Sequence, residues 1–130
     1  MRSRYLGIDE ILRIHIAEMG QNLLVDQGLL ESAVMRPQQT AFGQDAYPTL
    51  ALKAAALLQS LIGNHPFIDG NKRTAVLSTI VFLNLNGFEL NMDQQALVQL
   101  ALDIASGKPK LEAIAAVLQN GMRAWPGWRS

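Results

Sequence analysis

From Leu50 to Asn86 the chain reads LALKAAALLQSLIGNHPFIDGNKRTAVLSTIVFLNLN, and this stretch decides the fold. Its beginning, residues 50–62, is rich in alanine and leucine at helical spacing, and Gly63 is a natural helix-ending residue. Its end, residues 74–86, is a strongly apolar run, and Gly87 stops it. We therefore expect two helices with a polar segment between them. Because a helix that is apolar on all sides is usually buried, we place the second one at the centre of a helical bundle.

Apolar residues recur at helical spacing on both sides of this stretch and predict further helices. We expect these helices over residues 8–19, 26–35, 93–106 and 109–121. Residues 36–49 contain two prolines and a glycine and lack helical periodicity, which indicates a loop with a small hairpin around residues 42–47. The expected fold is all-α, a bundle of about six helices with a small hairpin or flap loop before the central helices. It forms a single domain over residues 1–130.

The composition is that of an ordinary folded domain, with 49% apolar and 17% charged residues. Lysine plus arginine equals aspartate plus glutamate, so the formal charge is zero and we expect no direct nucleic-acid binding. The chain has no cysteine, which excludes disulfides and thiolate metal sites and fits a reducing cytoplasm. We see no signal peptide, and the longest apolar run, residues 75–85, is shorter than the roughly 20 residues that span a bilayer. We therefore expect a cytoplasmic protein without a membrane segment.

Chemically reactive side chains are concentrated in the polar segment, just before the second apolar run. Gly70 and Asn71 begin the helix there, and the first N–H groups of a helix have no partners within it, so they favour an anion. Gly70 leaves room for a phosphate to approach closely, and Asn71 can donate a hydrogen bond without adding charge. Lys72 adds a mobile positive charge, and Arg73 offers several fixed donors to phosphate oxygens. These four residues indicate a phosphate-binding site.

A base and an acid accompany this anion site. His65 is the candidate base, because histidine is the residue type best suited to removing a proton near neutral pH. Pro66 biases His65 away from the helical region, so we expect it on an extended loop that an inward-facing Phe67 holds to the core. Asp69 would repel phosphate unless a cation intervened, and magnesium (Mg2+) typically shares its positions between carboxylates, phosphates and water. A base, a magnesium ligand and a phosphate site together indicate transfer of a phosphate-containing group from a nucleotide to a hydroxyl.

Structural interpretations stand beside these functional ones. An aspartate before a helix is a common cap, and charged residues in a first turn are often simply solvated. His15 lies among apolar residues, and we interpret it as a partly buried structural histidine without a chemical role. Thr74 is expected in a first helical turn, with its hydroxyl close enough to donate to a phosphate. Trp125 and Trp128 either fold back on the bundle or anchor a partner protein.

The polar segment resembles the signature of the Fic family, His-Pro-Phe-x-Asp/Glu-Gly-Asn-Gly-Arg-x-x-Arg. The matching residues are His65, Pro66, Phe67, Asp69, Gly70, Asn71 and Arg73. The helices on both sides also fit the helical core of that family, so the resemblance covers most of the chain and implies a Fic fold. By position it implies that His65 is the catalytic base, that Asp69 binds Mg2+, and that residues 70–73 bind phosphate.

Two positions depart from this signature. Lys72 stands where the family usually has glycine, and Val76 stands where it has the second arginine. Most Fic enzymes transfer AMP, using the glycine to make room for the α-phosphate and the arginine to hold the distal phosphate. Both departures are similar to the death-on-curing branch, the toxins of bacterial and phage toxin–antitoxin pairs. This branch implies ATP as phosphate donor, transfer of its γ-phosphate to a threonine of elongation factor Tu, and arrest of translation.

The resemblance further implies a cognate antitoxin protein that covers the active-site groove. Because Val76 cannot pair with the inhibitory glutamate of many Fic proteins, we expect inhibition by steric cover. Residues 38–48 correspond to the flap that aligns a target segment in the family. Two alternatives remain open: AMP transfer to a protein hydroxyl, and a non-catalytic module that keeps the fold and sequesters a partner. The intact His65 and Asp69 argue against the second.

Overall fold

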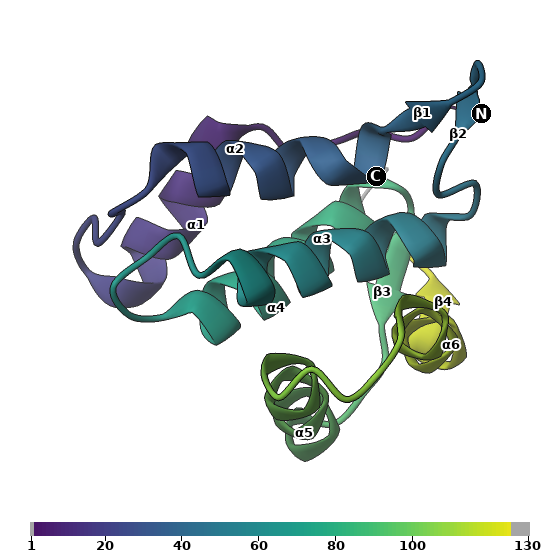
Figure 1. Cartoon of the computed structure of the whole chain (residues 1–130). Coiled ribbons are helices and arrows are strands. Elements are labelled where there is room, and N and C mark those ends of the chain that lie inside the picture. Colours follow the sequence, from purple (N-terminus) through teal and green to yellow (C-terminus); the bar gives the residue numbers. More distant parts are fainter. Residues whose placement is uncertain (1, 126–130) are drawn as a thin grey trace.

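The computed structural model describes residues 2–125, which form six α-helices, one 3₁₀ turn and four short strands (Figure 1). The helical elements are α1 (Ile8–Met19), α2 (Gln27–Met35), η1 (Arg36–Gln38), α3 (Leu50–Asn64), α4 (Asn71–Leu85), α5 (Gln94–Ala105) and α6 (Leu111–Gly121). The strands are β1 (Thr40–Ala41), β2 (Gln44–Asp45), β3 (Phe88–Leu90) and β4 (Met122–Ala124), paired antiparallel as β1–β2 and β3–β4. The mostly helical bundle expected from the sequence is confirmed. Within the described residues, no helix combines the length and apolarity needed to cross a membrane.

Helix α3, and not α4, is the central helix of the bundle. It contacts α2, α4, α5 and α6, and it buries ten of its fifteen residues, whereas α4 buries seven of fifteen. The alanines at 54–56 are fully buried, and their small side chains let neighbouring helices approach on several sides. Helix α4 instead leaves Val76, Leu77 and Ile80 partly exposed. The prediction that α4 lies at the centre is therefore wrong, because apolar content alone does not fix which helix has neighbours on every side.

Most of the expected helix ends hold to within a few residues. Helix α1 covers the predicted range, and the carboxylates of Asp26 and Asp93 cap α2 and α5 as expected from their positions. Gly63 does not end α3. The helix continues to Asn64, and His65 takes the left-handed capping conformation.

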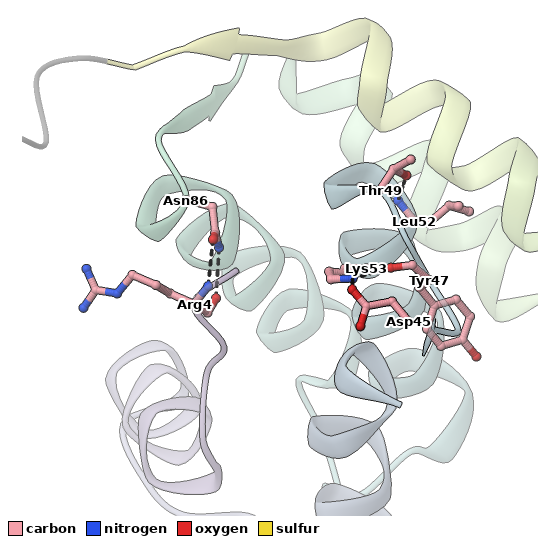
Figure 2. A network of polar contacts seen from close by, with 7 residues as sticks. All are labelled: Arg4, Asp45, Tyr47, Thr49, Leu52, Lys53 and Asn86. Atoms are coloured by element: carbon pink, nitrogen blue, oxygen red, sulfur yellow. Dashed lines mark hydrogen bonds and ion pairs between the residues drawn. The ribbon is translucent and has the colours of Figure 1, made fainter. Parts of the chain in front are cut away.

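Segments from both ends of the described chain are joined to the end of α4. The side-chain amide of Asn86 bonds the main chain of Arg4 in both directions, at 2.8 and 2.9 Å (Figure 2). The pairing of β3 with β4, which is not among the expected elements, brings the chain after α6 back beside Gly87. The half-buried Trp125 extends this pairing, because its N–H donates to the Gly87 carbonyl at 2.9 Å. Trp125 therefore folds back on the bundle, and Trp128 lies outside the described residues.

The expected hairpin forms two residues earlier than predicted, and it stands at the N-terminal end of α3 (Figure 1). Its strands are exposed, and Phe42 at the tip is fully exposed with a φ of 55°. Its base is held from α3 by the buried Lys53, whose Nζ donates to Asp45 Oδ2 at 3.0 Å and to the Tyr47 carbonyl (Figure 2). Arg36 Nε donates to the Tyr47 hydroxyl at 2.9 Å. The hairpin is thus attached through long side chains at its base.

Candidate active site

The polar segment forms a turn at the C-terminal end of α3 and leads directly into α4 (Figure 1). His65 caps α3 with φ 54° and ψ 54°, so it is left-handed and not extended as expected. Pro66 disfavours the right-handed helix for the preceding residue, but the left-handed alternative costs an L-residue about 1–2 kcal/mol. The rest of the turn must offset this cost. The His65 side chain is exposed, which leaves it accessible to a protein substrate.

Buried hydrogen bonds fix the inner side of this turn. The amide of Asn71, which is 5% exposed, accepts from the Phe67 N–H at 3.0 Å and donates to the Phe67 carbonyl at 2.7 Å. The N–H of Ile68 donates to the Leu23 carbonyl at 2.9 Å. Pro66 and Phe67 are buried, so Phe67 holds the turn to the core as expected. Because Phe67 engages both ends of the Asn71 side chain, the group that Asn71 can offer to a phosphate is its main-chain N–H.

Gly70 begins α4 in the left-handed region, with φ 80° and ψ 15°. Within the described chain no side chain caps α4, so its first N–H groups are available to an anion. A Cβ on Gly70 would lie 2.5 Å from Met19 Sδ. The space beside Gly70 is therefore filled by the end of the Met19 side chain, and not left open for a phosphate as expected. The left-handed backbone favours glycine here, and a side chain would also have to displace the flexible end of Met19.

The charged side chains of the motif face the solvent. Asp69, Lys72 and Arg73 are all exposed. Arg73 Nη1 lies 3.8 Å from Glu18 Oε1 on α1, a weak ion pair because both side chains are well exposed. Asp69 Oδ1 accepts from the Gly70 N–H at 2.8 Å, which orients the carboxylate and leaves Oδ2 for another partner. The arrangement places one acid and two cations around the start of α4.

This donor set fits a magnesium ion that is shared with a nucleotide. No cluster of three or more histidine, cysteine, aspartate or glutamate side chains occurs within residues 2–125. Asp69 therefore supplies a single carboxylate. Magnesium commonly binds through one or two carboxylates and takes its remaining ligands from phosphates and water. The available N–H groups at the start of α4 provide the complementary place for phosphate oxygens.

A fully buried histidine lies directly beneath the turn. The ring of His15 stacks on Phe67, with centroids 3.7 Å apart and planes at 10°. The Leu23 N–H donates to His15 Nε2 at 3.2 Å, so Nδ1 carries the proton and donates to Thr74 Oγ1 at 3.0 Å. Burial lowers the pKa of His15, and the nearby Asp69 carboxylate raises it to a lesser extent. His15 is thus more deeply buried than expected, and the Thr74 hydroxyl bonds inward instead of facing a phosphate.

An open, mostly apolar groove of about 490 Å³ extends from the motif along α4 and α5. The side chains that line it from α4 are Lys72, Arg73, Val76, Leu77 and Ile80. Helix α5 contributes the other apolar wall, and Glu18 of α1 stands beside Arg73 at the charged end. The groove explains why the outer side of α4 is apolar although it is not buried in the bundle.

The hairpin lies at the opposite end of α3 from His65 (Figure 1). Helix α3 has 15 residues and is therefore about 22 Å long at 1.5 Å per residue. The expected flap element is present, but it does not adjoin His65. Its position gives no support to a role in aligning a target segment at this histidine.

Comparison with known proteins assigns the turn and its flanking helices to a family. The model of the Fic/DOC family matches residues 5–83, a range that holds the whole motif turn. The chain belongs to the Fic/DOC family. It is 44% identical over 119 residues to Toxin Doc of Mycolicibacterium smegmatis (strain ATCC 700084 / mc(2)155), covering 89% of this chain and 92% of that protein. It is 28% identical over 121 residues to Protein kinase doc of Escherichia phage P1, covering 90% of this chain and 94% of that protein. The Fic fold and the likeness to death-on-curing toxins are confirmed.

Proposed function

We propose that this protein is a phosphotransferase toxin that transfers the γ-phosphate of ATP to a threonine hydroxyl of elongation factor Tu and so arrests translation. The observation that carries the proposal is the motif turn, where an exposed histidine and aspartate stand beside a helix start without a side-chain cap in the described structure. Its relatives named Toxin Doc and Protein kinase doc support both the toxin and the kinase parts of this proposal. We place the protein in the cytoplasm, where such a target is found.

Each polar residue of the turn has a defined part in this reaction. His65 takes the proton of the accepting hydroxyl while that oxygen bonds to the γ-phosphorus and the bond to ADP breaks. The first N–H groups of α4, with Lys72 and Arg73, bind phosphate oxygens and stabilise their charge. Asp69 would hold Mg2+, which supplies further neutralisation of the phosphate charge when bound. Asn71 acts through its main-chain N–H and keeps the turn in shape through its side chain.

Two residues favour phosphate transfer over AMP transfer. The exposed Lys72 stands in place of the glycine of most Fic enzymes, and a bulky side chain there disfavours an α-phosphate at that place. Val76 replaces the second arginine and lines the apolar groove, so it offers no donor to a distal phosphate. These features support a reversed nucleotide orientation with the γ-phosphate nearest to His65.

The groove along α4 supports a cognate antitoxin as partner. It begins at Lys72 and Arg73 and continues between apolar walls, so an amphipathic segment seated in it would cover the phosphate-binding end. An acidic side chain of that segment would meet the two cations, and its apolar side chains would fill the remainder. Inhibition would then be steric, because Val76 stands in place of the arginine that pairs with an inhibitory glutamate in many Fic proteins.

Two labelled forms of ATP test the reaction. Purified protein, Mg2+ and elongation factor Tu are incubated with γ-labelled or α-labelled ATP, and His65→Ala serves as the control. Label that reaches the factor from the γ position alone supports the proposal. Label from the α position alone would show that the protein transfers AMP instead of phosphate.

Expression in bacteria separates catalysis from sequestration. The His65→Ala protein is expected to be harmless at a level where the parent arrests growth. If both proteins arrest growth equally, toxicity comes from binding, and the non-catalytic alternative holds.

A further inference from the structure

His15 connects three segments of the site through one buried ring. Its face stacks on Phe67 in the motif turn, its Nε2 accepts from the Leu23 N–H, and its Nδ1–H donates to Thr74 in the first turn of α4. These partners come from parts of the chain up to 59 residues away from His15. The ring is 0% exposed, so it contacts no substrate.

These contacts close a loop around the inner side of the motif. Leu23 receives a hydrogen bond back from the Ile68 N–H, and Phe67 is bonded to Asn71, which begins α4. Phe67 lies midway between His65 and Asp69 in the sequence. A displacement of Phe67 would therefore move the proposed base and the proposed metal ligand together.

An apolar residue could fill the volume of His15 but could not make its bonds. It would leave the partly buried Leu23 N–H and the fully buried Thr74 hydroxyl without their partner, which is unfavourable. Asparagine can imitate the Nδ1 edge of the ring, and glutamine can imitate the Nε2 edge, but neither reproduces the flat face that stacks on Phe67. The combination of donor, acceptor and aromatic face in one rigid ring matches the three partners.

We propose that His15 is a positioning residue for phosphoryl transfer, which sets the relative placement of the motif turn and the start of α4 through its bonds to Leu23 and Thr74 and its stacking on Phe67. This inference rests on the proposed function. It predicts that His15 acts on the turnover step, through Phe67, and on ATP binding, through Thr74, without touching either substrate.

The test compares three substitutions with a matched control. His15→Phe keeps the ring and its volume but removes both bonds, His15→Asn keeps a donor for Thr74, and His15→Gln keeps an acceptor for Leu23. Leu118→Ala in α6 destabilises the core at a fully buried position away from the turn. For each protein we would measure kcat, KM for ATP, and hydrogen exchange at the amides of residues 23, 25, 67 and 68, which are bonded in or next to the turn.

The expected result is a kcat for His15→Phe lowered on the order of tenfold to a hundredfold, because small misplacements of reacting groups have effects of this size. Exchange at the four amides should be faster, whereas Leu118→Ala should change neither kcat nor local exchange at temperatures where it is folded. His15→Asn should keep the parent KM for ATP better than His15→Gln, because it keeps the bond to Thr74.

The proposal is overturned if His15→Phe keeps the parent kcat, whether or not the turn exchanges faster, because His15 would then be a core residue only. If His15→Phe does not fold, Thr74→Val removes the hydrogen bond between His15 and Thr74 from the other side. An unchanged KM for ATP and unchanged exchange rates in Thr74→Val would then overturn the proposal. A parent protein that transfers no phosphate overturns the proposed function. The exchange rates then decide alone whether His15 fixes the turn.

Discussion

The two ends of α3 carry two short polar segments that are held in different ways. At the N-terminal end, the hairpin is attached at its base by Lys53 and Arg36, while its strands and the tip residue Phe42 are exposed. At the C-terminal end, the motif turn is bonded along its inner side by Asn71, and the ring of His15 stacks on its Phe67. Both segments present exposed side chains, but buried polar groups bond the backbone within the motif turn, whereas the buried Lys53 bonds only the base of the hairpin.

The comparison shows that exposure of a side chain does not by itself mark a functional segment. Phe42 is fully exposed, yet the backbone beneath it has few constraints. Phe42 and His65 both have a left-handed φ, at 55° and 54°, so backbone strain does not distinguish the two ends. The buried hydrogen bonds between Asn71 and Phe67 do. Groups held in place before the substrate arrives need little reorganisation during reaction, which is where a catalyst gains rate. The comparison therefore predicts opposite responses to substitution at the two ends.

The largest expected effect is on activity at the motif end. His65→Ala should lower γ-phosphate transfer by about 10²–10⁴-fold, the usual loss when a general base is removed. Phe42→Ser, at the other end of α3, should leave the rate near that of the parent. Transfer rates at saturating ATP measure both. A large loss from Phe42→Ser would show that the hairpin takes part in target binding after all.

Asn71 tests the rigidity of the turn directly. Asn71→Ala leaves the N–H and the carbonyl of Phe67 buried without partners, and we expect a loss of about 2–4 kcal/mol in the free energy of unfolding. Lys53→Met loosens the hairpin base but leaves Asp45 half-exposed and solvated, so its cost should stay below about 1.5 kcal/mol. Urea unfolding of the two variants and the parent gives both values. The reverse order would contradict the contrast between the two ends.

A matched pair of glycines carries the comparison further. Gly70 and Gly43 have nearly the same φ, 80° and 77°. An added Cβ would meet Met19 at Gly70, whereas at Gly43 it meets none of the described atoms within 4 Å. Alanine at either position costs about 1–2 kcal/mol for the left-handed conformation. Gly70→Ala should cost up to about 1 kcal/mol more, because the flexible Met19 has to move. Thermal unfolding measures both, and adding Met19→Ala to Gly70→Ala should remove the excess.

The sequence predicts the helices and the reactive turn because both are signalled locally. Apolar spacing marks the helices, and the run from His65 to Arg73 stands together in the chain. The sequence does not reveal which polar side chains turn inward. The alanines of α3 and the hydrogen bond between His15 and Thr74 depend on contacts between residues far apart in the chain, which no local period encodes. The same reason explains why α4 is mistaken for the central helix and why the β3–β4 pairing is missed.

The burial of His15 predicts a pH-dependent stability with a definite sign. Burial lowers the pKa of His15 below its ordinary value of about 6.5, and the Asp69 carboxylate offsets only part of this. The unfolded chain therefore takes up a proton at a higher pH than the folded protein does. The contribution of neutral His15 is complete above about pH 6.5 and is lost as the pH falls through the lowered pKa. As the pH falls through this range, the melting temperature of the parent should fall relative to that of His15→Gln, which has no titrating group at this position, and parallel curves would contradict the assignment.

The smallest expected effect concerns Glu18, whose carboxylate lies 3.8 Å from the Arg73 guanidinium at the charged end of the groove. The pair is exposed, so Glu18→Gln should change the free energy of unfolding by less than about 0.5 kcal/mol. If Arg73 binds a phosphate, however, the carboxylate opposes the same anion, and its removal should lower KM for ATP about two- to fivefold at low salt. The gain should shrink as salt screens the charges. Asp9→Asn, near the other end of α1, is the matched control and should leave KM unchanged. An equal change in both variants would mean that net charge acts on ATP from a distance, and that Arg73 has no special place at the phosphate.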